Sequence, residues 1–257
     1  MTAKDIDQAK QEVRERVWTL LERDGAAPPG VHGHIPNFVG AERAAERLAE
    51  LEAWRAAGAV KSNPDKAQLA VRLRALHEGK LLYMAVPRLA TPRPFYLLDP
   101  ATLTTPFETA ATSGGAASAA RTIGVDEMHP VDLIVCGSVA VNRRGVRVGK
   151  GAGYSDIEVA LLTEAGLIRP EKMIVTTVHQ LQVVDDELPE TEHDFSVDVI
   201  VTPDEVIQCG PPRRPSGIVL AHLSAEKVAE IPVLAAYGVK QYQAPGYQCQ
   251  GSPNTSS

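Results

Sequence analysis

The chain has 257 residues, of which 44% are hydrophobic and 23% are charged, and its formal net charge is −6. This length suits one sizeable α/β domain or at most two small domains. The mild acidity argues against nucleic acid and anionic membrane surfaces as partners, because both select basic proteins. No apolar stretch approaches the roughly 18 residues of a membrane-spanning helix, so we expect no membrane span.

The N-terminus and the cysteines favour a cytoplasmic protein. Residues 1–18 are charged and lack the apolar core of a secretion signal. Cys136, Cys209 and Cys249 are odd in number and far apart in the sequence, which fits a reducing compartment and no disulfide framework. Cys136 lies in an apolar run, and we expect it to be a core residue.

The first half of the chain predicts helices and then a buried strand. Residues 5–22 place apolar side chains at helical spacing, and a loop rich in Pro and Gly follows at 25–36. Residues 40–58 predict one amphipathic helix, and residues 67–79 predict another. The short apolar run at 80–89 is typical of a buried strand.

The second half alternates strands with helices. Residues 131–142 predict a second buried strand, and residues 146–148 predict a short strand before a glycine-rich loop. A helix is expected at 155–167, with Ser155 or Asp156 at its start. The remaining expected elements are two strands, a helix and a disordered polar tail, at 171–179, 195–203, 224–238 and 241–257.

This alternation predicts an α/β fold with a mainly parallel sheet and helices on both faces. The sequence contains no internal repeat and no clear linker. We therefore expect a single domain over residues 1–240, in which the first 40 residues wrap or cap the sheet.

The glycine-rich loop at residues 146–158 is the most informative stretch. Gly149, Gly151 and Gly153 occupy alternate positions, where backbone N–H groups can turn toward an anion just ahead of a helix N-terminus. The spacing matches neither the P-loop nor the dinucleotide-binding pattern. On spacing alone, a plain glycine-rich turn after a strand stays open as an alternative.

Charged residues near the loop suit a nucleotide phosphate with a divalent cation. Arg147 and Lys150 would supply positive charge. Asp156 would repel a bare phosphate but is suited to Mg²⁺, and Asp194, just before a predicted strand, is a second candidate oxygen ligand. The alternative is that Asp156 is a simple helix cap and Asp194 a turn residue.

Lys10 and Arg14 lie four residues apart in the first predicted helix and therefore share one face. Two cations on one face suit an anion opposite them. Without other information, however, a solvated charged stripe is the favoured interpretation. The histidines have no metal-ligand spacing, and no Ser/His/Asp arrangement is evident from the sequence.

Together these motifs resemble the 5-formyltetrahydrofolate cyclo-ligase family. The N-terminal Lys-x-x-x-Arg helix of that family is matched by Lys10 and Arg14, its GK…PR strand by "GKLLYMAVPRL", and its glycine loop by "RVGKGAGYSDI". The resemblance covers about residues 5–220 and is strongest to a divergent branch of proteins that contain a methenyltetrahydrofolate synthetase domain. Further matching positions are Gln182, Pro189, His193, Asp194 and Thr202.

The resemblance implies a fold of the NagB/RpiA/CoA-transferase-like type. It also implies an ATP- and Mg²⁺-dependent cyclo-ligase that converts 5-formyltetrahydrofolate to 5,10-methenyltetrahydrofolate. The formyl oxygen is a poor leaving group until it is phosphorylated, after which a neighbouring folate nitrogen attacks and phosphate departs. The protein would contribute positioning and charge neutralisation. The expected partner is a folate or related small molecule, and we expect a monomer or homodimer.

The resemblance also implies roles for individual residues. Lys150 and Tyr154 would be catalytic, and Asp156 and Asp194 would hold Mg²⁺. Asp65 and Arg88 are the candidates for substrate binding. The ATP-binding residues implied by the resemblance are Lys10, Arg14, Arg147, Gly149, Lys150, Gly151, Ala152, Gly153 and Tyr154.

The sequence departs from the family pattern mainly on the folate side. Ser155 stands where the family has a second loop Tyr, and Ile157 stands where it has Arg. The family's Glu-containing segment is replaced, and Asp65 is the candidate stand-in. Two alternatives therefore stay open. One is an ATP-dependent enzyme with a non-folate acceptor, and the other is a non-catalytic nucleotide-binding protein.

Overall fold

A computed structural model describes residues 3–220 and 223–235, and its centre is an eight-stranded sheet. The five middle strands pair in parallel, and antiparallel strands lie at both edges. In sheet order the strands are β11 (Val206–Gln208), β10 (Val199–Val201), β8 (Met173–Thr177), β5 (Leu133–Cys136), β1 (Ala59–Ser62), β2 (Leu81–Ala85), β3 (Phe95–Leu98) and β4 (Arg121–Ile123).

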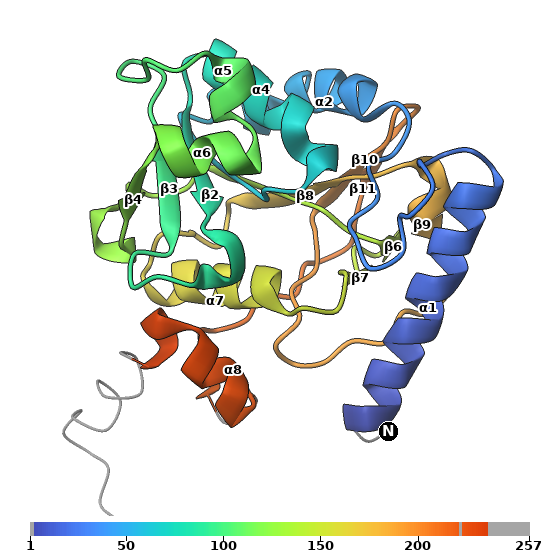
Figure 1. Cartoon of the computed structure of the whole chain (residues 1–257). Coiled ribbons are helices and arrows are strands. Elements are labelled where there is room, and N and C mark those ends of the chain that lie inside the picture. The colour runs from blue at the N-terminus through green and yellow to red at the C-terminus, as the bar shows by residue number, and fades with distance from the viewer. Residues whose placement is uncertain (1–2, 221–222, 236–257) are drawn as a thin grey trace, which may run out of the picture.

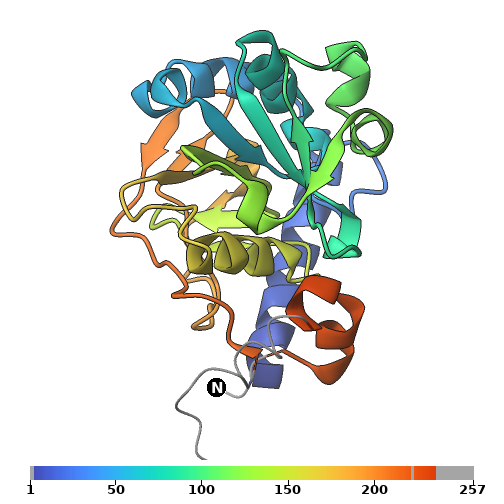
Figure 2. The ribbon, with the colours of Figure 1, turned by 90° about the vertical axis from the view of Figure 1, so that its left-hand side faces the viewer.

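Helices cover both faces of this sheet, as Figures 1 and 2 show. Short 3-10 turns connect several elements, at Lys66–Gln68 (η1), Pro87–Leu89 (η2), Val125–Glu127 (η3) and Gln180–Gln182 (η4). The α-helices are α1 (Ala3–Arg23), α2 (Ala41–Ala49), α3 (Glu52–Ala56), α4 (Leu69–His77), α5 (Phe107–Ala110), α6 (Ser113–Ala119), α7 (Tyr154–Glu164) and α8 (Ala225–Glu230).

The central strands contribute side chains to two separate apolar layers. In β5, Leu133 and Val135 join the layer beneath α2, α4 and α6, whereas Ile134 and Cys136 join the layer beneath α7. Successive side chains of a strand point to opposite faces, so a strand covered on both faces reads as a continuous apolar run. The prediction of a parallel sheet between two helical layers is confirmed, and Cys136 is a core residue.

A second, three-stranded sheet lies beside the main one. It contains β7 (Arg147–Val148), β6 (Ala140–Asn142) and β9 (Val183–Val184). The N-terminal helix α1 packs against this sheet and against η4, so the start of the chain caps one side of the fold (Figure 1). Every helix in the described ranges is too short or too polar to cross a bilayer. The expected tail at 241–257 lies outside those ranges.

The order in which strands are added to the sheet reverses at β1. The chain passes from β1 to β2 on one side, and β5 later joins β1 on the other side. In a parallel sheet, the connections at such a point leave in opposite directions and open a crevice at the carboxyl ends of the strands. The topology therefore predicts a ligand site beyond Ser62 and Cys136.

Two predicted elements are divided in the structure. The prediction of a single helix at 40–58 is wrong, because Leu51 adopts an extended backbone conformation between α2 and α3. This break lets the Trp54 indole donate a hydrogen bond to Glu78 at 2.7 Å. Local helix propensity is thus overridden by tertiary packing.

The buried strand expected at 131–142 is also two strands, β5 and β6, which belong to different sheets. The chain turns at Gly137, where a Cβ atom would lie 2.6 Å from the side chain of Ile35. Neither Ser155 nor Asp156 caps the helix that follows the glycine loop. The N-cap of α7 is Gly153, and Asp156 lies within the first turn.

Gly145 fixes the β6–β7 hairpin, which leads into the glycine-rich loop. Its φ is +87°, and a Cβ atom would lie 2.2 Å from the carbonyl oxygen of Val197. Gly79 has a similar φ of +76° but open space around it. Both Ala substitutions should strain the backbone by about 1–2 kcal/mol. Gly145→Ala should lower the free energy of unfolding by roughly 1–3 kcal/mol more, because it also overpacks. Urea denaturation measures this difference, and equal losses in the two variants would contradict it.

Candidate active site

A cavity of about 960 Å³ opens beyond the carboxyl ends of β1, β2 and β5, where the sheet topology predicts it. Residues of α1 near the start of the chain and of α8 near its end complete the wall. The lining segments include 63–65 after β1, 85–88 after β2, Gly137 after β5, the loop 149–156, and residues of α1 and α8.

The glycine-rich loop forms one wall of the cavity. Gly151 and Gly153 have φ values of +96° and +71°, which side-chain-bearing residues rarely adopt. Gly153 is the N-cap of α7 and makes no side-chain cap, so the first backbone N–H groups of α7 are left for other acceptors. A loop of this kind, followed by a helix N-terminus, suits an anion.

The two cations of α1 line the cavity, and Arg14 bonds to the glycine-rich loop. Arg14 Nε donates to the carbonyl oxygen of Gly149 at 2.7 Å, and Lys10 Nζ lies 2.6 Å from Asp194 Oδ2. Burial lowers the pKa of the Arg14 guanidinium, and the neighbouring charge of Arg147 adds to this effect. The sequence-predicted pair from the first helix therefore lies at the cavity, where Lys10 is bound to the predicted metal ligand Asp194.

Arg147 lies behind the loop. Its guanidinium donates to the carbonyl oxygen of Gly137 at 3.2 Å and to Ser138 Oγ at 3.3 Å, and it stacks on the Phe195 ring with 4.6 Å to the centroid. Its remaining nitrogen lies 3.4 Å from Asp156 Oδ1. Arg147 is 6% exposed, so it supports the loop from within and contributes charge to the cavity from below.

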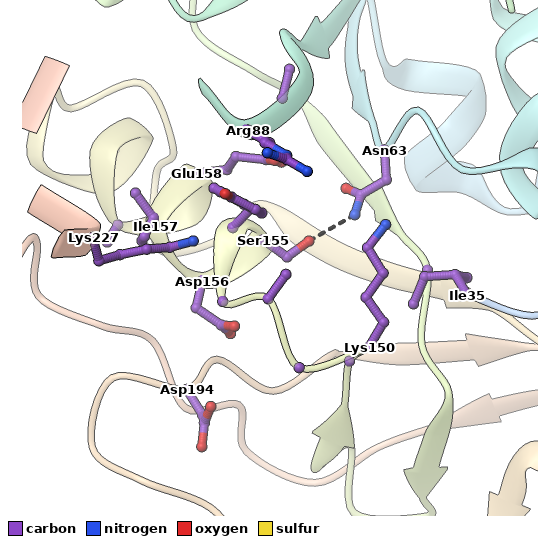
Figure 3. A pocket seen from close by; sticks show the side chains of 18 of the residues that line it. Ile35, Asn63, Arg88, Lys150, Ser155, Asp156, Ile157, Glu158, Asp194 and Lys227 are labelled. Atoms are coloured by element: carbon purple, nitrogen blue, oxygen red, sulfur yellow. Dashed lines mark hydrogen bonds between the residues drawn. The ribbon is translucent and has the colours of Figure 1, made fainter. Parts of the chain in front are cut away.

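Asp156 and Asp194 lie on the same side of the cavity (Figure 3). Burial raises the pKa of Asp156, and the negative charge of Asp194 acts in the same direction, against the opposing effect of Arg147. The pKa of Asp194 is lowered, because hydrogen bonds from Lys10 and Thr191 outweigh its burial. The two predicted metal ligands are therefore brought together. In the described ranges no third His, Cys, Asp or Glu joins them as a preformed metal cage.

The two predicted catalytic side chains are each held by a partner. Lys150 Nζ lies 3.1 Å from Asp65 Oδ1, so a predicted nucleotide-side cation is paired with a predicted substrate-side carboxylate. The Tyr154 hydroxyl donates to Glu230 of α8 at 2.9 Å. Lys227 Nζ lies over the Tyr154 ring, 3.5 Å from its centroid. Helix α8 thus covers the start of α7 at the cavity.

Arg88, the other predicted substrate residue, follows β2 and lines the cavity. It has a φ of +58°, and Leu89 has a φ of +52°; they are the only non-glycine residues with positive φ in the described ranges. Such strain costs of order 1–3 kcal/mol and persists at ligand clamps and active sites. The strained turn leaves Arg88 exposed while Leu89 is fully buried, so it directs a guanidinium to the cavity mouth.

Sequence reasoning missed a buried ion pair beneath the cavity. Lys61 in β1 contacts Glu158 in α7, and both side chains are nearly inaccessible to solvent. Lys61 Nζ also donates to Asn63 Oδ1 at 2.7 Å. The sequence did contain a signal for this pair: Lys61 stands within an apolar strand and Glu158 within an apolar helix. Because buried charges require partners, each residue indicated an oppositely charged partner elsewhere in the chain.

Arg72 was missed as well. It is 1% exposed and donates to the carbonyl oxygens of Asn63, Pro64 and Asp65, which form the loop after β1. A further bond reaches the Ala111 carbonyl at 2.7 Å. Burial lowers the pKa of Arg72 to about 10. This side chain holds the loop that carries Asp65 at the cavity edge.

A family model described as the 5-formyltetrahydrofolate cyclo-ligase family matches residues 6–203, well over half of the chain. The methenyltetrahydrofolate synthase domain-containing protein of Bos taurus is 39% identical over 243 residues, with 92% of this chain and 63% of that protein covered. The Mus musculus protein of the same name is 40% identical, with 92% and 65% covered. The chain therefore spans less than two thirds of the length of these relatives.

The fold also has a solved counterpart. The NMR structure of Aquifex aeolicus 5,10-methenyltetrahydrofolate synthetase covers 77% of this chain with a TM-score of 0.50 and 21% sequence identity, and 92% of that structure is matched. At this identity the likeness concerns the fold alone. The family model and the relatives, taken with the arrangement of the glycine-rich loop and α1, establish that the chain belongs to the 5-formyltetrahydrofolate cyclo-ligase family.

Proposed function

We propose that this chain is an ATP- and Mg²⁺-dependent cyclo-ligase that converts 5-formyltetrahydrofolate to 5,10-methenyltetrahydrofolate. The observation that carries the proposal is the gathering of α1 cations, the glycine-rich loop and two carboxylates around one cavity. Family membership and the names of the relatives support the same reaction.

The nucleotide would lie along the glycine-rich loop. Lys10, Arg14 and Lys150 surround the loop with positive charge, and the N-terminus of α7 points its N–H groups the same way. Charge-assisted hydrogen bonds to phosphate are about twice as strong as neutral ones. Ala152 and Tyr154 complete this wall, with the Tyr154 ring held beneath Lys227.

Asp156 and Asp194 fit the donor set of Mg²⁺, which binds through one or two carboxylates together with substrate phosphates. The cation would neutralise the charge that develops on the transferred phosphate. In the absence of a cation, Asp156 lies in an environment that disfavours its ionised form, as its raised pKa indicates. That electrostatic conflict supports a role for the pair beyond holding the fold together.

In the proposed reaction the formyl oxygen attacks the terminal phosphorus of ATP. The new oxygen–phosphorus bond replaces the bond to ADP, which leaves. The neighbouring folate nitrogen then attacks the formyl carbon, loses its proton, and phosphate departs with the former formyl oxygen. The chain's own residues hold the two reactants in line and balance the phosphate charge, which is where most of the acceleration of phosphoryl transfer arises.

One observation favours a second candidate, an ATP-dependent enzyme with a different acceptor. Ile157, at the position of the family's Arg, is buried in the apolar layer below α7. Ser155 is bonded to Asn63 at 2.7 Å instead of presenting a ring. These two departures beside the cavity support a different acceptor as the second candidate.

The first prediction concerns Lys150. Lys150→Ala should lower ATP-dependent formation of methenyltetrahydrofolate by about 10- to 100-fold, because a charge-assisted hydrogen bond to phosphate contributes roughly 1.5–3 kcal/mol. Absorbance of the product measures the rate. Lys172→Ala is the matched control, since Lys172 also pairs with a carboxylate, Asp132, at 3.0 Å, but far from the cavity. Equal rates in both variants would contradict the assignment.

The second prediction concerns the two carboxylates, whose pKa values are shifted in opposite directions. The raised pKa of Asp156 means that its ionised form costs stability at neutral pH and that this cost vanishes on acidification. Asp156→Asn should therefore raise Tm at pH 7 without ligand, and the gain should shrink as the pH falls.

Asp194→Asn is the matched opposite case. A lowered pKa contributes stability that is present above the unfolded pKa and is lost as the pH falls through the folded pKa. This variant should lose Tm at pH 7 and approach the wild type at acidic pH. Thermal unfolding from pH 7 downward tests both signs. Both variants should also lose Mg²⁺-dependent turnover, and shifts of the same sign would contradict the electrostatic assignment.

The third prediction separates the candidate functions. Thermal shift with Mg-ATP and with 5-formyltetrahydrofolate should raise Tm for each ligand if the acceptor is a folate. A shift with ATP alone favours the different acceptor. ATP binding without turnover of any acceptor supports a non-catalytic nucleotide-binding protein, and ATP turnover that disappears in Asp156→Asn excludes it.

A further inference from the structure

Four polar side chains form a chain of contacts from the interior to the cavity. Glu158 contacts Lys61, Lys61 Nζ donates to Asn63 Oδ1 at 2.7 Å, and Asn63 Nδ2 donates to Ser155 Oγ at 2.7 Å. Lys61 is fully buried, whereas Asn63, Ser155 and the nearly buried Glu158 line the cavity. The last contact is drawn in Figure 3, near the centre of the cavity.

The chemistry of these groups fixes the direction of every proton in the chain. An ammonium can only donate, so the Asn63 oxygen must face Lys61 and its NH₂ group must face Ser155. An amide NH₂ can also only donate, so Ser155 Oγ is the acceptor of that bond. The Ser155 hydroxyl proton is therefore left to donate elsewhere, and one hydrogen of Asn63 Nδ2 is left as well. Within the described residues, the Ser155 hydroxyl has no other hydrogen bond.

We propose that Ser155 and Asn63 form a hydrogen-bond donor pair that binds a neutral carbonyl oxygen of the acceptor. The inference rests on the proposed function and names residues that select its second substrate. Both donors are uncharged, and the two charges behind them, on Lys61 and Glu158, are paired with each other. An anionic oxygen would be bound less strongly by this pair than by the positive charge of Arg88 or Lys150. An amide-type oxygen matches two neutral donors.

The position of the pair suits this role. Ser155 immediately precedes Asp156 in the first turn of α7, so a carbonyl bound there lies next to the phosphate-handling wall. Asn63 begins the loop that carries Asp65, the partner of Lys150. The pair thus stands where the nucleotide side and the acceptor side of the cavity meet (Figure 3).

Lys61 and Glu158 act as positioning residues in this arrangement. Their ion pair is buried, so it is held in one geometry, and the Asn63 amide cannot flip while Lys61 faces it. Donors that are oriented before binding lose little entropy on binding. Without the ion pair, the Asn63 amide would be free to reverse and present an acceptor to the ligand.

Ser155→Ala tests the donor directly, with Ser155→Thr as the conservative variant that keeps the hydroxyl. Titration calorimetry with 5-formyltetrahydrofolate should give a Kd about three- to tenfold weaker for Ser155→Ala, the value of one neutral hydrogen bond. Ser155→Thr should bind like the wild type, and the Kd for Mg-ATP should be unchanged in both. Wild-type folate affinity in Ser155→Ala, or a loss confined to ATP, overturns the inference.

A second variant tests the positioning. Replacing both charges together, Lys61→Met with Glu158→Met, avoids an unpaired buried charge and is commonly tolerated. This double variant should weaken folate binding as Ser155→Ala does and leave ATP binding unchanged. Adding Ser155→Thr to the double variant should not restore folate binding. Unaltered folate binding in a folded double variant overturns the positioning role. A wild-type protein that binds Mg-ATP but no folate overturns the proposed acceptor, and the donor-pair inference falls with it.

Discussion

The buried ion pair between Lys61 and Glu158 joins the two halves of the cavity. Lys61 belongs to β1 at the centre of the main sheet, and Glu158 belongs to α7, which follows the glycine-rich loop. The desolvation cost of two buried charges is several kcal/mol per ion and is offset only in close geometry. The ion pair therefore fixes how the loop after β1 faces the start of α7, and the proposed donor pair of Asn63 and Ser155 spans these two segments.

The same principle recurs behind the other cavity walls. Arg72 binds the carbonyl groups of the loop after β1, and Arg147 binds the turn after β5. Loops at the carboxyl edge of a parallel sheet have few apolar contacts of their own. Buried cations replace those contacts with directed bonds to backbone oxygens, which hold the loops in single conformations. The resulting excess of positive charge below the cavity suits a site built for phosphate.

The order and type of the central elements were predictable because buried parallel strands and amphipathic helices have distinct periods. The gathering of Lys10, Arg14, the glycine-rich loop and Asp194 followed only from the resemblance, because charge spacing alone favours a solvated helix face. Lys61 and Glu158 could not be paired from the sequence, since 97 positions separate them. Their pairing depends on α7 packing against β1, which no local pattern specifies.

Described residues beyond the family match also line the cavity or contact residues that do. The family model ends at residue 203, yet Lys227 and Glu230 of α8 contact Tyr154 at the cavity. The hydrogen bond from Tyr154 is the main cause of the lowered pKa of Glu230, and the charges of Lys227 and Arg88 add to it. Residues beyond the family match thus hold Tyr154 at the start of α7. Under the proposed roles, a change of acceptor would alter Ser155 or Asn63 and would require no change in the three glycines of the loop.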